Sequence, residues 1–79
     1  MVDRILGEKV IGIKQSTKAI QHGEGKVLYV AEDADMMLIN PLICLAKEKN
    51  IDIRSIETMK KLGKMCGIEV KAATALILE

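Results

Sequence analysis

Val27-Leu28-Tyr29-Val30-Ala31 is a run of five β-prone apolar residues, and the acidic segment Glu32-Asp33-Ala34-Asp35 follows it directly. A continuous apolar run of this length is typical of a strand that is covered on both faces. We therefore predict that residues 27–31 form the central strand of a sheet and that residues 32–35 form a turn. The segments on either side should supply the neighbouring strands and the covering helices.

The segment before this strand has the pattern of a short strand followed by a helix. Val10-Ile11 is a β-prone pair that Gly12 closes, and the spacing of apolar and basic residues over 14–21 predicts a helix. Residues 2–8 predict one further helical turn, capped by Asp3.

The segment after the central strand predicts two more helices and two more strands. Asn40-Pro41 has the pattern of a helix start, with Asn as N-cap and Pro at the first position, so a helix is expected from Pro41 to about Lys49. Alternating isoleucines predict a strand over 51–56, and Thr58 can cap a helix that ends at Gly67. Residues 72–78 are ambiguous in composition, and we predict a strand because the sheet needs a partner.

Strands alternating with helices predict an α/β fold, specifically a three-layer α/β/α sandwich around a roughly four-stranded mixed sheet. The 79 residues are enough for one domain and leave no room for a second. Apolar residues make up 49% of the chain and Tyr29 is the one aromatic residue, so the core must be aliphatic.

The cysteines indicate a reducing compartment. Cys44 and Cys66 form no CxxC pair and lack the further His or Cys ligands that a zinc site needs. We therefore predict two buried thiols and no metal. No stretch is long and apolar enough for a membrane span, and the first residues do not resemble an export signal. We expect a cytoplasmic protein without a membrane partner.

The charge is unevenly distributed although the net charge is only +1. Residues 9–26 carry four lysines against one glutamate, and residues 58–71 carry the same balance. The segment between them is net acidic. Such sorting can give a small domain a basic face, and scattered solvated lysines are the alternative interpretation.

The residues that catalysis requires are scarce. His22 is the single histidine, and no serine or cysteine lies in a nucleophile motif. Asp33 and Asp35 can cap the next helix, which explains them without a metal ion, and no phosphate-binding glycine loop is present. We predict that the chain is not an enzyme and uses no cofactor. A hidden pocket built from Asp33, Asp35 and His22 is the enzyme alternative.

Two strand-to-helix junctions have the features of a binding site. In the first, Gly12 precedes a helix whose start carries Ile13, Lys14 and Gln15, with Lys18 one turn behind; helix starts attract phosphate. In the second, Glu57, Thr58, Met59 and Lys60 lie at the start of another helix. An apolar side chain beside lysines suits contact with an unpaired base, and the alternative is that Met59 packs under its loop.

Three separated motifs resemble the kink-turn-binding ribosomal protein family of L7Ae and L30e, and most closely its short bacterial ribosome-associated members. They are Gly12-Ile13-Lys14-Gln15-x-x-Lys18, Val30-Ala31-Glu32-Asp33-Ala34-Asp35, and Lys61-Leu62-Gly63-Lys64 followed by Cys66-Gly67-Ile68-Glu69-Val70. The resemblance extends over residues 9–78 in order. It implies the same sandwich fold and recognition of a kink-turn, which is a duplex bent sharply at an internal loop with tandem sheared G·A pairs.

The resemblance also implies roles for individual residues. Gly12 would permit close approach of the RNA, Lys14 and Gln15 would address guanine edges, and Lys18 would add charge. Residues 57–60 would form a loop that covers a flipped-out base. Archaeal and eukaryotic members usually have Asn-Glu at the positions of Lys14-Gln15, so here an amide replaces a carboxylate that accepts more strongly.

The sequence thus predicts a non-enzymatic, monomeric RNA-binding domain spanning residues 1–79. Its partner would be a structured RNA, with ribosomal RNA among the candidates, and no DNA partner is expected. The alternative from another class is a protein-interaction module that docks through the helix over 41–49 or through a sheet edge, without specific RNA readout.

Overall fold

The computed structural model describes residues 8–78, in which strands and helices alternate. The elements are β1 (Lys9–Ile11), α1 (Ile13–Gln21), β2 (Val27–Ala31), α2 (Met36–Glu48), β3 (Asp52–Ile56), α3 (Met59–Met65) and β4 (Thr74–Ile77). The helical turn predicted within residues 2–8 lies outside the described residues, except for Glu8.

The strands form one mixed sheet in the order β1-β4-β2-β3. β4 is antiparallel to both β1 and β2, whereas β2 and β3 are parallel. The apolar run at residues 27–31 is therefore an inner strand, as predicted. The ambiguous segment at residues 72–78 does contain a strand, and all four residues of β4 are buried.

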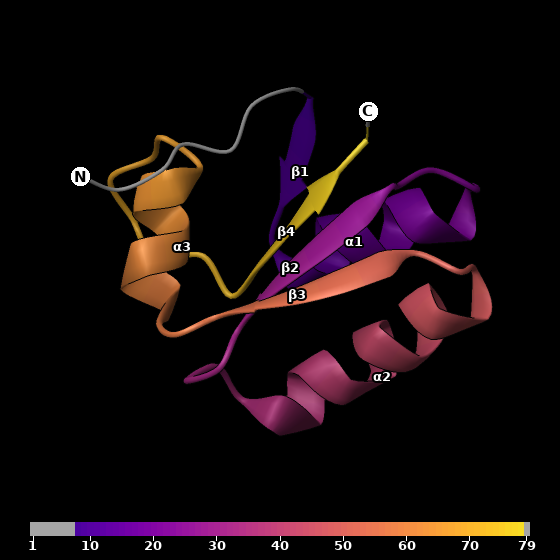
Figure 1. Cartoon of the computed structure of the whole chain (residues 1–79), viewed down its shortest axis with the longest axis horizontal. Helices are drawn as coiled ribbons and strands as arrows, with labels where there is room; N and C mark the ends of the chain where they lie inside the picture. The colour runs from indigo at the N-terminus through magenta and orange to yellow at the C-terminus, as the bar shows by residue number, and fades with distance from the viewer. Residues whose placement is uncertain (1–7, 79) are drawn as a thin grey trace.

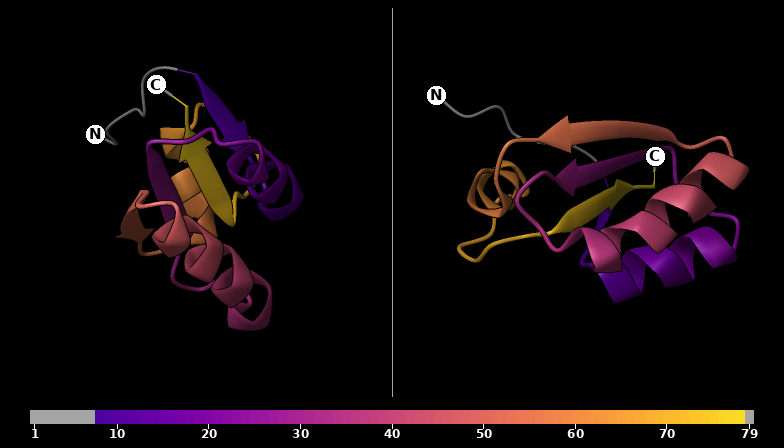
Figure 2. Two further views of the ribbon diagram at one scale, coloured as in Figure 1. Left: turned by 90° about the vertical axis from the view of Figure 1, so that its right-hand side faces the viewer. Right: turned by 90° about the horizontal axis from the view of Figure 1, so that it is seen from below.

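The helices are distributed unequally around the sheet. α1 and α2 pack against each other and cover one face, whereas α3 packs against β2, β3 and β4 near one end of the sheet (Figure 1, Figure 2). These arrangements confirm the predicted α/β class with a four-stranded mixed sheet. Within residues 8–78, no helix is long and apolar enough to cross a membrane.

The core is aliphatic, as the composition predicts. Its largest side chains come from α1, β2, α2, α3 and β4 and are at most 1% exposed: Ile20, Leu28, Ile39, Leu42, Leu62 and Leu76. Burial of each such side chain contributes about 1.5–3 kcal/mol. Every helix and both inner strands are thereby anchored to the same interior.

The predicted start of the second helix is wrong. α2 begins at Met36, five residues before Pro41, and Asp35 is its N-cap because its side chain accepts a hydrogen bond from the Met37 N–H at 3.0 Å. Pro41 lies inside the helix on its exposed side. It removes the N–H that would bond the Met37 carbonyl, and water can replace that bond on an exposed face.

The prediction of two buried thiols is correct for Cys66 and wrong for Cys44, which is exposed. Leu42 and Ala46, two residues to either side, turn inward from α2, so the position between them must face outward. Burial raises the pKa of the Cys66 thiol above its ordinary value, because the thiolate would lose its hydration.

Candidate functional site

The two junctions that the sequence singled out lie at the same end of the sheet. β1, β2 and β3 finish there and β4 begins there, since Ile11 pairs with Ala75, Val30 with Thr74, and Ala31 with Ile56. The starts of α1, α2 and α3 follow these strand ends directly. One end of the domain therefore gathers the N-termini of α1, α2 and α3.

The start of α1 is shaped by Gly12. Its φ of 104° and ψ of 153° lie in a region that residues with a side chain adopt only at a cost, so the position requires glycine. Within residues 8–78, and apart from Gly12 and its two chain neighbours, no atom lies within 4 Å of the place where a Cβ would stand, so this space is open on the described part of the protein. α1 also lacks a side-chain cap and has no acidic residue in its first turn, which leaves its N-terminal dipole uncompensated.

The polar contact residues predicted on α1 are exposed, whereas the predicted apolar one, Ile13, packs against the core. The exposed ones are Lys14, Gln15 and Lys18, and Ile13 is partly buried. Sequence reasoning missed Ser16, which is 0% exposed and pairs its hydroxyl with that of Thr74 at 3.4 Å. The helix is thus fixed to β4 through its inner side while its polar tip stays available.

The second junction joins β3 to α3. Glu57, Thr58 and Lys60 are exposed, and Thr58 caps α3 by accepting from the Lys61 N–H at 3.0 Å. Met59 is partly buried and packs against the core, which agrees with the alternative interpretation that it lies under its loop. Its side chain contributes the floor of this junction, and Glu57, Thr58 and Lys60 form the accessible rim.

A short segment before and at the start of β4 holds the two junctions in register. The Thr74 carbonyl accepts from the Gly12 N–H at 3.0 Å, and the Ala72 N–H donates to the Met59 carbonyl at 3.0 Å. Between them, the Ala73 carbonyl accepts from the Ala31 N–H at 2.9 Å. Residues 72–74 therefore bridge from the start of α1 to the start of α3.

The junctions form two groups rather than one cluster. β1 and β3 are the outer strands and are separated by three strand spacings, so their ends lie roughly 14 Å apart. The first group is Gly12, Ile13, Lys14, Gln15 and Lys18, and the second is Glu57, Thr58, Met59 and Lys60. A ligand that contacts both groups must be large, and it would span this end of the sheet.

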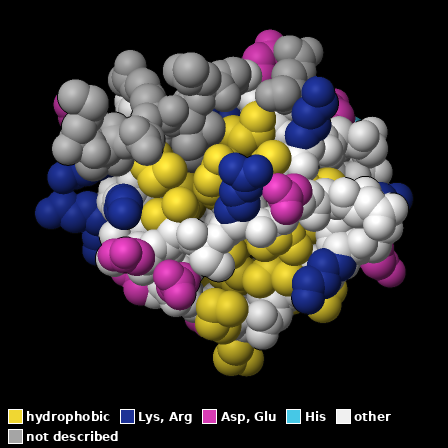
Figure 3. All heavy atoms as spheres, in the orientation of Figure 1, with side chains coloured by type: hydrophobic (Ala, Val, Ile, Leu, Met, Phe, Trp, Pro, Cys, Tyr) yellow, Lys and Arg dark blue, Asp and Glu magenta, His cyan; other side chains and the backbone are white. Residues whose placement is uncertain are grey.

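Basic side chains extend the second group along α3. Figure 3 shows lysine and arginine side chains gathered at the side of the molecule where α3 lies in Figure 1. Lys61 and Lys64 of this helix are exposed together with Lys60. Three exposed lysines are therefore grouped on α3, next to the second junction.

The residues proposed for an enzyme site are not brought together. Asp33 accepts from the Met59 N–H and Asp35 caps α2, so both carboxylates have structural partners. His22 follows the last residue of α1, roughly 14 Å along that helix from its start. Within residues 8–78, no three His, Cys, Asp or Glu side chains are grouped so that they could hold a metal ion.

With this geometry in place, the chain can be assigned to a family. It belongs to the ribosomal protein L7Ae/L30e/S12e/Gadd45 family, whose model matches residues 6–79. It is 44% identical over 72 residues to the RNA-binding protein YbxF of Geobacillus stearothermophilus, which covers 91% of this chain and 88% of that protein. It is 48% identical over 69 residues to an RNA-binding protein of Bacillus pumilus (strain SAFR-032), covering 87% and 84%.

The fold recurs at lower sequence similarity. The Giardia lamblia 15.5kD RNA binding protein superimposes with a TM-score of 0.84 at 22% identity, and the match covers 90% of this chain. This chain spans 60% of the length of the Giardia chain. The shared α/β architecture is therefore retained where most side chains differ.

Proposed function

We propose that this chain is a non-enzymatic RNA-binding protein that recognises and stabilises kink-turn RNA, and that it acts as a monomer in a cytoplasmic, ribosome-associated ribonucleoprotein. The observation that carries the proposal is the start of α1. An open, glycine-led and uncapped helix N-terminus displays Lys14 and Gln15, with Lys18 one turn behind. The two bacterial relatives named as RNA-binding proteins support RNA as the partner.

The contacts divide into base readout and backbone positioning. Lys14 and Gln15 stand at the tip of α1, where a donor and an amide can meet the guanine edges of tandem G·A pairs. Lys18 and the N–H groups of the first turn face phosphate. On the other side of the sheet end, Glu57, Thr58 and Lys60 form the rim above Met59 that would cover a flipped-out base.

Stabilisation of the RNA follows from preferential binding. An internal loop exchanges between extended and kinked conformers, and only the kinked one presents phosphates and base edges to both junctions at once. Because the protein binds that conformer more tightly, its binding shifts the RNA population toward the kink. The backbone hydrogen bonds of residues 72–74 support this outcome, since they join the two junctions in one arrangement that suits an RNA reaching both.

A titration at physiological salt tests the proposal. The probe is a kink-turn RNA, and its control has the tandem G·A pairs changed to Watson–Crick pairs. We expect clear preference for the kink-turn RNA. Equal and weak binding to both, erased by salt, would remove the proposed function and leave only a generic basic face.

A protein-interaction module without specific RNA readout is the second candidate function. The observation in its favour is the exposed apolar start of α2, where Met37 is 84% and Leu38 58% exposed. Apolar side chains at such exposure on neighbouring positions are typical of contact surfaces. A chain that shows no RNA preference and keeps its partners at high salt would act through this helix.

A further inference from the structure

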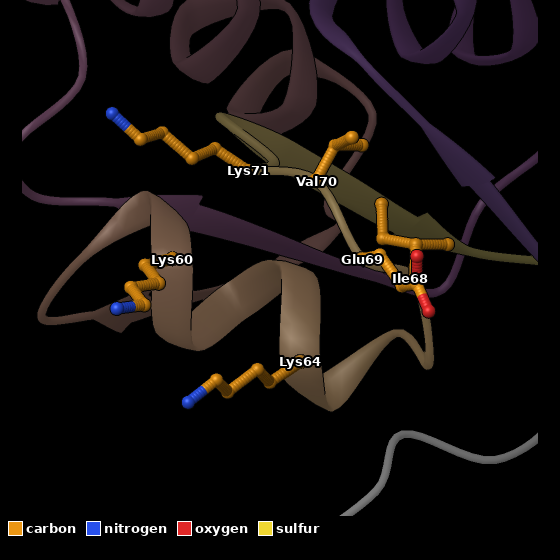
Figure 4. A pocket seen from close by; sticks show the side chains of 6 residues that line it. All are labelled: Lys60, Lys64, Ile68, Glu69, Val70 and Lys71. Atoms are coloured by element: carbon orange, nitrogen blue, oxygen red, sulfur yellow. The ribbon is translucent and has the colours of Figure 1, made fainter.

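A groove runs between α3 and the loop that follows it, and it extends beyond the second junction, with which it shares only Lys60. It is lined by Lys60, Lys64, Ile68, Glu69, Val70 and Lys71 (Figure 4). Gly63 holds the loop close to the helix, since its carbonyl accepts from the Ile68 N–H at 3.1 Å and a Cβ there would meet the Val70 carbonyl. The two walls of the groove are therefore fixed against each other.

The charge of the groove is positive. Three lysines and one glutamate line it. In Figure 4 the ammonium groups of the lysines lie along one side, while the carboxylate of Glu69 lies at the opposite end, beside Ile68. Lys60 and Lys64 are one helical turn apart, so their ammonium groups can meet successive anionic groups of one ligand.

Apolar side chains line the other wall. Val70 is 69% exposed and Ile68 is partly exposed, although most aliphatic residues of this chain are packed inside. Lysines beside an exposed apolar surface match an unpaired nucleotide, whose phosphate is anionic and whose base has a large apolar face. An acidic peptide would satisfy the lysines but would leave Val70 without a matching contact.

The groove continues from the second junction. Lys60 and Lys64 also line a shallow hollow together with Thr58, the cap of α3. A strand that leaves an RNA bound at the sheet end can therefore pass over Thr58 and enter the groove along Lys60 and Lys64.

We propose that this groove binds an unpaired RNA strand that leaves the bound internal loop. Lys60, Lys64 and Lys71 contact its phosphates, and Val70 and Ile68 contact one base. This inference rests on the proposed function, because the strand is delivered by an RNA bound at the two junctions. It adds a second RNA surface that carries no base-pair specificity.

The test compares kink-turn RNAs with and without a single-stranded oligouridine extension, attached to each strand end in turn. The variants are the double substitution Lys64→Ala and Lys71→Ala, and Val70→Ser. Lys47→Ala with Lys49→Ala removes the same charge at the far end of α2, about 20 Å from its start, and is the matched control. All five side chains are exposed, so the folded structure should persist.

We expect one of the two extensions to tighten binding by the unaltered chain several-fold. The Lys64/Lys71 variant should lose that gain and lower the dependence of binding on salt by about 1.4 in log–log slope, since each single-strand phosphate contact contributes about 0.7. Val70→Ser should lose part of the gain, and the control pair should keep it. Preference for the kink-turn over its Watson–Crick control should be unchanged in all variants.

Two results would overturn the proposal that the groove binds an unpaired RNA strand. One is no gain from either extension while the kink-turn preference is intact. The other concerns polyglutamate. If the unaltered chain binds polyglutamate and the Lys64/Lys71 variant does not, while the variant binds the extended RNA as tightly as the unaltered chain does, the groove is a protein-docking surface. Failure of the proposed function looks different, because the unextended kink-turn RNA then shows no advantage over its Watson–Crick control.

Discussion

The carboxylate of Asp33 accepts a hydrogen bond from the backbone N–H of Met59 at 2.8 Å, across 26 residues of sequence. It ties the turn after β2 to the first residue of α3. Thr58 caps the same helix through the Lys61 N–H, so two side chains satisfy the first turn of α3. The second junction is therefore held by an acidic residue that sequence reasoning assigned to the next helix.

Two substitutions of Asp33 distinguish the effect of its hydrogen bond on stability from the effect of its charge. Asp33→Ala removes the acceptor and should lower the free energy of unfolding by about 1 kcal/mol, the usual cost of a lost helix cap. Asp33→Asn keeps an acceptor oxygen and should retain most of that stability. Chemical denaturation measures both, and hydrogen exchange of the Met59 amide should accelerate in Asp33→Ala alone. Equal exchange in the two variants would contradict this role.

Gly63 is needed for a contact rather than for its backbone angles. Alanine favours a helix over glycine by about 1 kcal/mol, but its Cβ would meet the Val70 carbonyl, which belongs to the backbone and cannot rotate away. We expect Gly63→Ala to destabilise the chain by about 2 kcal/mol. Lys64→Ala, one exposed residue further, should stay within about 0.5 kcal/mol of the unaltered chain, and thermal unfolding of both variants checks the contrast.

At Gly12, in contrast, glycine is required by the backbone angles and not by a contact with the surrounding protein. L-alanine at this position should cost about 1–3 kcal/mol because of the positive φ, although its side chain meets no protein atom. If RNA occupies the space above Gly12, the folded L-alanine variant should bind kink-turn RNA more weakly, because its Cβ stands in that space. A titration of the folded variant with kink-turn RNA checks this. Unchanged binding would show that the space above Gly12 is not used.

The two cysteines should differ in reactivity. Cys44 is exposed and should be alkylated in the folded chain, whereas Cys66 is buried and should react only after unfolding. Burial raises the pKa of Cys66 above the ordinary value of 9.0, so the unfolded chain loses this proton first as the pH rises. The neutral thiol therefore contributes its full stabilisation at pH values below 9.0, and this contribution is lost as the pH rises from there through the pKa of the folded chain. Cys66→Ala should flatten the fall in stability at alkaline pH, and denaturation at several pH values measures this.

The fold could be read from the sequence because its signals are local. The apolar run at residues 27–31 and the Thr58 cap are short patterns, and both appear in the structure where they were predicted. Pro41 misled the prediction of α2, since a proline on an exposed helical face costs less than one in a buried turn. The burial of Cys44 was predicted from the absence of a metal-site pattern, which does not specify the face of α2 that this residue occupies.

Part of the local geometry of the candidate site could be predicted for the same reason. Gly12 and Lys14 stand in a recognisable strand-to-helix pattern, and the structure places them at the start of α1 with Lys14 exposed. The Asp33 contact to Met59 and the groove beside Gly63 depend on segments that meet only after folding. No spacing rule connects Asp33 with Met59, 26 residues away, and the groove depends on how the loop after α3 folds back against Gly63, which no sequence pattern specifies.

Gln15 gives the sharpest test of base readout. Its side chain is exposed at the tip of α1, so Gln15→Ala should leave stability unchanged and weaken kink-turn binding by about 1–3 kcal/mol, while a plain duplex is barely affected. Gln15→Glu supplies a charged acceptor and should tighten the kink-turn complex if the amide accepts from guanine. Lys60→Ala is the matched comparison: it should weaken both RNAs similarly and reduce the salt dependence, because a phosphate contact carries no sequence information. Titrations of the three variants against both RNAs decide the roles. Equal losses on kink-turn and duplex for Gln15→Ala would remove base readout from this residue and leave Lys14 to carry it.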